Sequence, residues 1–577
     1  MRYILFLIVC FFSVVHSSFG QIPPTIFEQS NGTKTPEYKE IIDWWKKIDA
    51  ASPKVKMLQK GNTDANIPLN LVLVNNSGIF DIQKIKKSNL RIILINNGIH
   101  PGEPDGIDAS ILLVRDIVAN KYKLPDNVVL AIIPVFNIGG SLNRSSFYRI
   151  DQDGPEEFGS RGNSQNLDLN RDFIKNDSRE TSSFATIFHE LDPDIFLDNH
   201  VSNGADYQHV ITLLSTHHDK LNPVMGKYLK QNFVPDLYTR MHTKNYDLVP
   251  YVNHWSNKKV ESGWNGFWDS PRYSTGYAAL FHCFSFMTET HMLKPYKKRV
   301  NATYAMMQSL IEFASENSYK INDIRKKAKQ ETINQILFPL NFVHDTTIID
   351  TIVFKGYESF YKPSPVSGFP RLYYDTTQPF TKRIPYFNGF RSTDTVSKPK
   401  AYIIPQGWWK VTDRLKQNNV KMSQLPNDTS ILVEHYRITG YNIAGKYEGH
   451  HLNTNVQTST NLQRINFRKG DYYIPMNQVA NKFLIEVLEP TAEDSYFAWN
   501  FFDPILNRKE GYAAYVFEDK AAKILETYPY IQDSINAKKQ MNPGFPKSGK
   551  ELLDYIFELS PYYEPDHLRY PVYRIKD

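Results

Sequence analysis

Short apolar runs alternate with longer stretches of helical periodicity through the first half of the chain. Residues 91–96 (RIILIN) predict a strand with a wholly apolar centre, which Asn97 and Gly98 end. Apolar residues then recur at helical spacing over 107–118. The same reasoning predicts further strands at 71–74, 127–136, 195–198, 210–214 and 284–288, and a helix at 178–191. This alternation predicts an α/β fold with helices on both faces of a mixed sheet.

The pattern changes near residue 320. A charged stretch at 320–329 leads into sequence rich in Pro, Tyr, Thr and Asp, where turn residues separate short β-type runs. Those runs lie at 351–354, 401–404, 431–433 and 483–487, and helical patterns follow at 519–539 and 549–559. They predict a mainly β second domain, a sandwich or barrel, with helices near its end. Because 577 residues exceed one ordinary core, we expect domains at 21–325 and 326–577.

Residues 1–20 have the features of a secretory signal peptide. Arg2 precedes an apolar run from Tyr3 to Val15, and small residues stand before Gln21. This run is short for a membrane span, and no later stretch is apolar enough. We therefore expect an exported protein, periplasmic or secreted, and not an integral membrane protein. Only two cysteines occur, which excludes a disulfide framework, and export without disulfides suggests a bacterial source.

The charge of the chain excludes one class of partner. The net charge is +6 over 577 residues, and no run of five Lys or Arg occurs, so nucleic-acid binding is not indicated. Aromatic residues make up 14% of the chain, which fits strand packing. The sequence does not determine the oligomeric state.

Three segments carry side chains that bind zinc. His100 and Glu103 follow the predicted strand 91–96 directly, and His200 follows the predicted strand 195–198. Sites in α/β sheets form just outside the carboxyl ends of strands. Two histidines and one glutamate with an open fourth position are typical of a catalytic zinc site.

Other residues supply the remaining parts of a hydrolase. Glu289 ends an apolar strand, where a carboxylate is costly unless it is paired or functional, and it is a candidate general base. Asn170 and Arg171 suit a peptide's terminal carboxylate, and Asp168 is placed to orient His100. Each has a structural alternative, such as a salt bridge for Glu289 or a surface ion pair for Arg171.

Taken together, these segments resemble the zinc carboxypeptidases of the carboxypeptidase A type, the M14 metallopeptidases. The resemblance covers roughly residues 37–320 and keeps the segments in family order. It implies an α/β/α sandwich around a mixed eight-stranded sheet. It also implies one Zn²⁺ per chain, held by His100, Glu103 and His200, with Glu289 as the catalytic base. Asn170 and Arg171 then hold the substrate carboxylate, and Asp168 stands behind the first zinc histidine.

Two further family roles are assigned by the surrounding sequence. The arginine that stabilises the oxyanion is expected to be Arg161, because Arg161-Gly-Asn163 leads into the Asp168–Arg171 segment, although Arg149 and Arg144 stay open. The mobile tyrosine that closes over the substrate is expected to be Tyr277, next to Gly276.

The resulting hypothesis is a metallocarboxypeptidase that releases C-terminal amino acids from peptides. One alternative keeps the zinc chemistry but acts on peptidoglycan-derived peptides with D-amino acids or γ-linked bonds, or removes acyl groups from amines. Another alternative is an inactive peptidase fold that serves as a binding protein. The presence of all three metal ligands and the base argues against inactivity.

Overall fold

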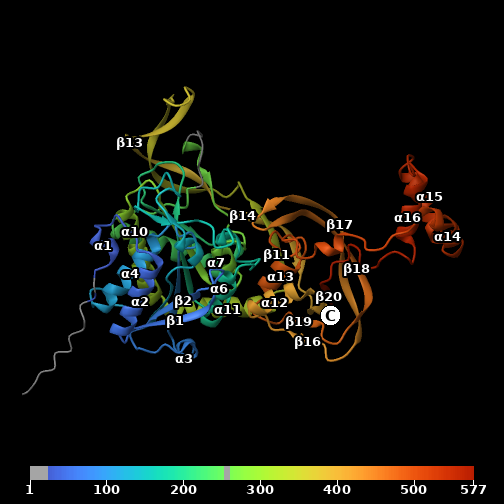
Figure 1. Ribbon diagram of the computed structural model, residues 1–577, viewed down its shortest axis with the longest axis horizontal. Coiled ribbons are helices and arrows are strands. Elements are labelled where there is room, and N and C mark those ends of the chain that lie inside the picture. The colour runs from blue at the N-terminus through green and yellow to red at the C-terminus, as the bar shows by residue number, and fades with distance from the viewer. Residues whose placement is uncertain (1–21, 23, 253–259, 577) are drawn as a thin grey trace, which may run out of the picture. The chain divides into compact units, whose positions relative to one another are not determined.

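The computed structural model of the protein describes residues 22, 24–252 and 260–576 (Figure 1). The expected signal peptide, residues 1–20, lies outside the described residues. The chain forms two compact units. Unit 1 comprises the described residues up to Ala328 together with Asp345–Gly389, and unit 2 comprises Lys329–His344 and the described residues from Phe390 onward.

Unit 1 is built on a seven-stranded sheet in the order β1-β2-β4-β3-β7-β10-β8. Neighbouring strands are parallel from β4 through β3 and β7 to β10, and antiparallel at both margins. The strands are β1 (Val55–Asn62), β2 (Pro68–Val74), β3 (Arg91–Asn97), β4 (Val128–Ile133), β7 (Ile195–Ser202), β8 (Ile211–Ser215) and β10 (Phe284–His291). The mixed α/β fold is confirmed, whereas the expected count of eight strands is wrong for this sheet, which has seven.

Helices cover both faces of this sheet, because its strands are apolar on both sides. Ile195 and Leu197 point into the core shared with the helices of one face. Phe196, which points the other way, packs on Phe184 of the opposite face. The first face carries α2 (Tyr38–Ala51), α4 (Asp105–Val118), α7 (Pro223–Tyr228), α8 (Val234–Thr243) and α10 (Tyr296–Glu316). The second carries α6 (Arg179–Leu191), whose Ser178 cap accepts a hydrogen bond from the Thr181 N–H.

The parallel strands β3, β7 and β10 all end at one edge of the sheet, and their last residues lead into the candidate site. Asn96 is paired with Asp198, and Glu289 with His200, across this edge. The other short elements of unit 1 are α1 (Ile26–Gln29), α3 (Ile82–Lys87), α5 (Ile138–Leu142), α9 (Ser274–Ala279), β5 (Arg144–Ser145), β6 (Phe158–Gly159) and β9 (Trp264–Asn265).

A long two-stranded ribbon also belongs to unit 1. Strands β12 (Asp350–Pro363) and β13 (Pro370–Phe387) pair antiparallel along their lengths and form the yellow hairpin labelled at β13 in Figure 1. Residues 351–354, which the sequence pattern placed in the second domain, lie in this ribbon and therefore in unit 1. The remainder of the predicted division at residue 325 stays a prediction.

Unit 2 is mainly β, as expected. Its six-stranded sheet has the order β16-β19-β15-β20-β17-β18, and β11 pairs with β14. The strands are β11 (Leu337–His344), β14 (Phe390–Ser397), β15 (Ala401–Ile404), β16 (Ser423–Gln424), β17 (Thr429–Tyr447), β18 (His450–Phe467), β19 (Tyr472–Pro475) and β20 (Tyr573–Ile575). Its helices are α12 (Trp409–Gln417), α13 (Asn481–Leu488), α14 (Ala514–Thr527), α15 (Pro529–Met541) and α16 (Gly549–Leu559), and α11 (Ser318–Asn334) crosses the boundary between the units.

One prediction of local structure in unit 2 is wrong. The apolar run 483–487, predicted as a strand, lies within helix α13, because periodicity cannot separate a short buried strand from a buried helix. The helical pattern at 519–539 is confirmed, and it forms two helices that meet at Tyr528 and Pro529, since proline opens a new helix and cannot continue the old one.

The search for membrane-spanning helices among the described residues found none of sufficient length and apolar character.

Candidate active site

The strand β3 delivers the first two candidate ligands. After Asn97 the chain turns through Gly98, whose positive φ of 67° suits glycine. The N–H of Glu103 then donates to the carbonyl of His100 at 2.8 Å and closes a tight turn. This turn places the imidazole and the carboxylate on the same side, both buried. His200 arrives from the neighbouring strand β7.

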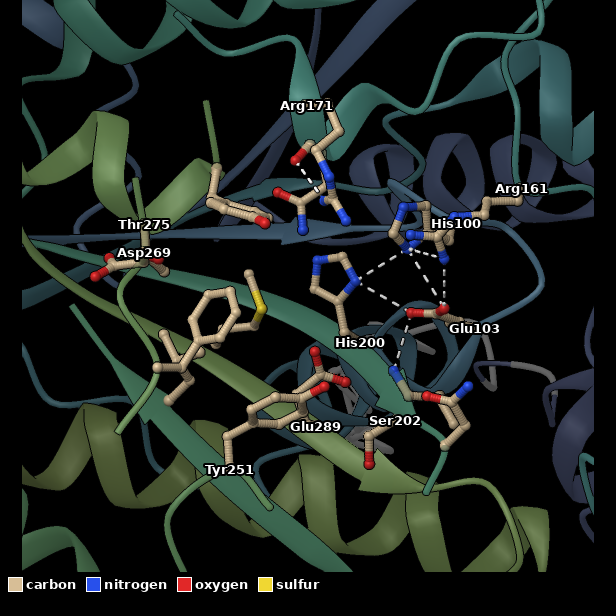
Figure 2. A pocket seen from close by; sticks show the side chains of 17 residues that line it. His100, Glu103, Arg161, Arg171, His200, Ser202, Tyr251, Asp269, Thr275 and Glu289 are labelled. Carbon is tan, nitrogen blue, oxygen red and sulfur yellow. Dashed lines mark hydrogen bonds and ion pairs between the residues drawn. The ribbon is translucent and has the colours of Figure 1, made fainter. Parts of the chain in front are cut away.

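The three side chains converge on one point, as Figure 2 shows. His100 Nδ1 lies 3.2 Å from His200 Nδ1 and 3.3 Å from Glu103 Oε1, and His200 Nδ1 lies 3.1 Å from Glu103 Oε2. Ligand atoms arranged tetrahedrally at about 2.0–2.1 Å from zinc lie about 3.3 Å apart. The spacing of the three atoms therefore matches a tetrahedral ion.

In both imidazoles a hydrogen bond at Nε2 determines that Nδ1 is the nitrogen available to a metal. His100 Nε2 lies 2.9 Å from Asp168 Oδ1, and His200 Nε2 lies 2.9 Å from Asp198 Oδ2. Because a carboxylate accepts, each Nε2 donates to its aspartate, which leaves each Nδ1 as the nitrogen directed at the common point. Two imidazole nitrogens and an ionised carboxylate that converge in this way are the donor set of a zinc site, so these residues fit a metal.

Glu103 is held as an anion by its surroundings. Arg149 Nη1 donates to Oε1 at 2.7 Å, and the N–H of Val201 donates to Oε2 at 3.0 Å. Burial alone would raise the pKa of Glu103, but Arg149 and the two histidines hold it well below its usual range. The carboxylate therefore stays ionised, as a metal ligand must.

The same cavity contains groups suited to a carboxylate. It has a volume of about 170 Å³, and Asn170 and Arg171 line it together with the three candidate ligands. Asp168 starts the 3₁₀ turn Leu169–Arg171 by accepting from the Asn170 N–H at 2.9 Å. Tyr273 lies under the Arg171 guanidinium, 4.6 Å from its carbon. A planar cation and an amide are thus held side by side at the wall.

Glu289 also lines this cavity, from strand β10 beside His200. Burial raises the pKa of its carboxyl to about 8, and the nearby Glu103 charge adds to the rise, while His200, Arg149 and Arg161 oppose it. A carboxyl with such a pKa binds a proton more strongly than an exposed glutamate does.

Comparison with known proteins shows which proteins this chain resembles. Residues 41–217 match the zinc carboxypeptidase family, peptidase M14. The chain carries a zinc carboxypeptidase domain. Carboxypeptidase 2 of Trichophyton equinum is 22% identical over 494 residues, which cover 81% of this chain and 84% of the relative. Carboxypeptidase 2 of Trichophyton rubrum is 21% identical over 423 residues, covering 70% and 72% respectively.

Among solved structures, a metallo-carboxypeptidase from Burkholderia cenocepacia is similar with a TM-score of 0.36 and 16% identity. The match covers 48% of this chain and 69% of that one.

The expected oxyanion arginine lines the cavity of the carboxypeptidase domain. Arg161 donates to Asp168 Oδ2 through Nε and Nη2, and its side chain is half exposed. Its Nη1 lies 3.4 Å from His100 Nδ1. The two alternatives are engaged elsewhere, since Arg149 binds Glu103 and the Val201 carbonyl, and Arg144 donates to backbone carbonyls near Thr35. Of these three arginines, Arg161 is the one that lines the cavity.

The structure does not place Tyr277 in the cavity. Tyr277 is 1% exposed, its hydroxyl lies 3.1 Å from His189 Nε2, and it packs among phenylalanines that include Phe173 and Phe188. Helix α9 turns this side chain into the core under the sheet, so proximity to Gly276 was misleading. The tyrosines that line the cavity are Tyr251 and Tyr273.

The sequence did not reveal that Asp198 and Ser274 form hydrogen bonds with residues of the candidate site. The Asp198 carboxylate accepts from His200 Nε2 and from the Ser274 hydroxyl. The Ser274 N–H donates to Asn170 Oδ1 at 3.2 Å. One chain of hydrogen bonds therefore connects a candidate metal ligand to the candidate carboxylate-binding amide. The Asp-x-His spacing was the available signal for Asp198; Ser274 had none.

Proposed function

We propose that this protein is an exopeptidase of the metallocarboxypeptidase class that releases single C-terminal amino acids from peptides. The observation that carries the proposal is the content of one cavity. It holds a three-residue donor set whose ligand atoms converge, a carboxyl with a raised pKa, and an amide–guanidinium pair. Each answers one requirement of C-terminal amide hydrolysis.

His100, Glu103 and His200 are the residues that hold the metal, one ion per chain. Zinc bound there supplies Lewis acidity toward the scissile carbonyl and toward water. The Asp168 carboxylate fixes the tautomer and orientation of His100, and the Asp198 carboxylate does the same for His200.

Glu289 moves the protons. Its carboxylate takes a proton from the attacking water and later gives it to the leaving amine. Arg161 reaches the region above His100 and stabilises the negative oxygen that develops on the carbonyl. Because Arg161 is held by Asp168 through two nitrogens, it is oriented before the substrate arrives.

Asn170 and Arg171 set the position of cleavage. They bind the terminal carboxylate of the substrate, so only the last peptide bond reaches the metal ligands and Glu289. Tyr251 or Tyr273, in place of Tyr277, is the tyrosine that contacts the bound residue.

We also infer that the protein is exported, because of the expected signal peptide at residues 1–20, and that peptidoglycan-derived peptides are among its possible substrates. The bacterial source stays a prediction, and the relatives compared by sequence come from fungi.

The test measures zinc content and release of C-terminal residues from a mixed peptide library, with wild type beside Glu289→Gln. One zinc per chain and release that is lost in the variant support the proposal. Zinc without release from ordinary peptides favours cell-wall peptides or acylated amines as substrates. Absence of zinc after loading would refute the metallopeptidase.

A further inference from the structure

Unit 1 has a second cavity, larger than the candidate active site, against the β12–β13 ribbon. Its volume is about 500 Å³, compared with about 170 Å³ for the first. Five aromatic side chains line it, of which Trp264 and Phe354 are buried and three are partly exposed, and all except Trp264 belong to the ribbon. They are Trp264, Phe354, Tyr357, Tyr374 and Phe380. Aromatic walls of this kind bind flat or apolar groups.

The ribbon is fixed to the rest of unit 1 at its base. The Gln208 N–H donates to the Lys355 carbonyl at 2.9 Å, and the Gln208 amide donates to the carbonyls of Gly356 and Phe380. The Lys355 N–H donates to His209 Nε2 at 3.1 Å. These bonds hold the aromatic wall in place, so the cavity is preformed.

The two cavities adjoin along two short segments. Asn203 lines the first cavity, and Ala205 and Asp206 line the second. Likewise Tyr251 lines the first and its neighbour Val252 lines the second. Because consecutive residues lie about 3.8 Å apart, the cavities are separated by little more than one layer of chain.

The order of groups in the first cavity sets the direction of a bound peptide. In Figure 2, Arg171 lies on one side of His200 and Ser202 on the other. If Arg171 holds the terminal carboxylate, the residues before the scissile bond leave on the side of Ser202 and Asn203. In the protein chain, Ser202 and Asn203 lead directly to Ala205 and Asp206, which line the second cavity.

We propose that the ribbon cavity binds residues of the peptide substrate that lie N-terminal to the scissile bond, with a preference for aromatic side chains. The proposal rests on the proposed function, which sets the direction of the peptide. The charges of the cavity add a second preference. Lys382 is paired with Glu261 and Glu358 at 2.8 and 3.0 Å, and Asp206 is paired with Lys294 at 2.8 Å. Lys382, the cation of the described lining, is thus already held by carboxylates, which disfavours acidic side chains.

Kinetics with short and extended substrates test the proposal. Tyr374→Ala removes a ring from the cavity, and Tyr373→Ala is the matched control, because Tyr373 faces the other side of the ribbon and packs on Phe360. The substrates are a blocked dipeptide and peptides with four further residues that include Phe, Ala or Glu.

For wild type we expect the highest kcat/KM with the Phe-containing peptide and the lowest with the Glu-containing one. Tyr374→Ala should lower kcat/KM for the Phe-containing peptide about tenfold, mainly through KM, because a tenfold change corresponds to about 1.4 kcal/mol, which one aromatic contact can contribute. The dipeptide and the Tyr373→Ala enzyme should be unaffected. Equal losses on short and extended substrates, or no loss, would overturn the proposal. Tyr357→Ala repeats the test if Tyr374→Ala fails to fold.

A binding measurement separates failure of this inference from failure of the proposed function. The dissociation constant of a fluorescently labelled Phe-containing peptide is measured by anisotropy with wild type and both Tyr variants, after zinc loading. Weaker binding to Tyr374→Ala alone supports the cavity as a peptide site even if no peptide is cleaved. Equal binding to all three proteins contradicts it, whether or not wild type is a carboxypeptidase.

Discussion

The Asp198 carboxylate provides a sharp test of how the candidate metal site is held. It is completely buried and accepts from His200 Nε2 at 2.9 Å and from the Ser274 hydroxyl. Asp198→Asn keeps the size and the oxygen acceptor but removes the charge. His200 then loses a charge-assisted partner, and its Nδ1 becomes a weaker and less strictly oriented donor to a metal.

The expected magnitude follows from this one contact. A hydrogen bond to a charged group contributes about 1.5–3 kcal/mol. At about 1.4 kcal/mol per tenfold change, the affinity for zinc should fall about 10–100-fold, in line with partners of other metal-bound histidines. Ser274→Ala removes only one of the bonds to the same carboxylate and should cost less.

The assay is competition for zinc with a chromogenic chelator, followed by thermal unfolding of the metal-free proteins. Ser285→Ala is the control for Ser274→Ala, because Ser285 is an equally buried serine whose hydroxyl donates to the Thr275 carbonyl instead. Asp198→Asn with zinc affinity within about twofold of wild type would refute the reasoning, since the predicted effect is at least about tenfold.

Three further outcomes are expected. Glu289→Gln should lower kcat by about a hundred- to ten-thousand-fold while the zinc content, measured by atomic absorption, stays unchanged; near-normal turnover would remove Glu289 as the base. Arg171→Ala should lower kcat/KM about 100-fold on peptides with a free C-terminus, but not on an acylated amine that lacks a carboxylate, and equal losses would contradict its role. The pH dependence of stability should change in Asp108→Asn. Burial raises the pKa of Asp108 from 3.8 to about 7. The folded state therefore holds this proton more tightly than the unfolded state, and the associated stability is present at low pH and lost as pH rises through about 7. Urea unfolding measures the free energy of unfolding at about pH 5 and at about pH 8. Between these two pH values it should fall less for Asp108→Asn than for wild type. An equal fall in both proteins would show that Asp108 does not titrate in this range.

The sequence by itself determined the parallel core of the sheet and the three candidate ligands. Residues 92–95 are a short, wholly apolar and mostly β-branched run that the turn signal Asn97-Gly98 ends, and these features favour a buried strand. His100 and Glu103 lie in the turn that immediately follows, so their place at the edge of the sheet is a local property of the chain. His200 and Glu289 lie near the ends of neighbouring strands for the same reason.

Tertiary packing decided the features of the site and of the domain division that no local sequence pattern indicates. Tyr277 lies near the site in sequence, but α9 directs it into the aromatic core, because the direction of a helical side chain depends on what the helix packs against. The link from Asp198 through Ser274 to Asn170 joins three distant segments. Residues 351–354 read as part of a β-rich second domain, yet their ribbon docks on unit 1 through Gln208. Long-range contacts of this kind arise only when the whole chain has folded, so no periodicity or spacing reveals them.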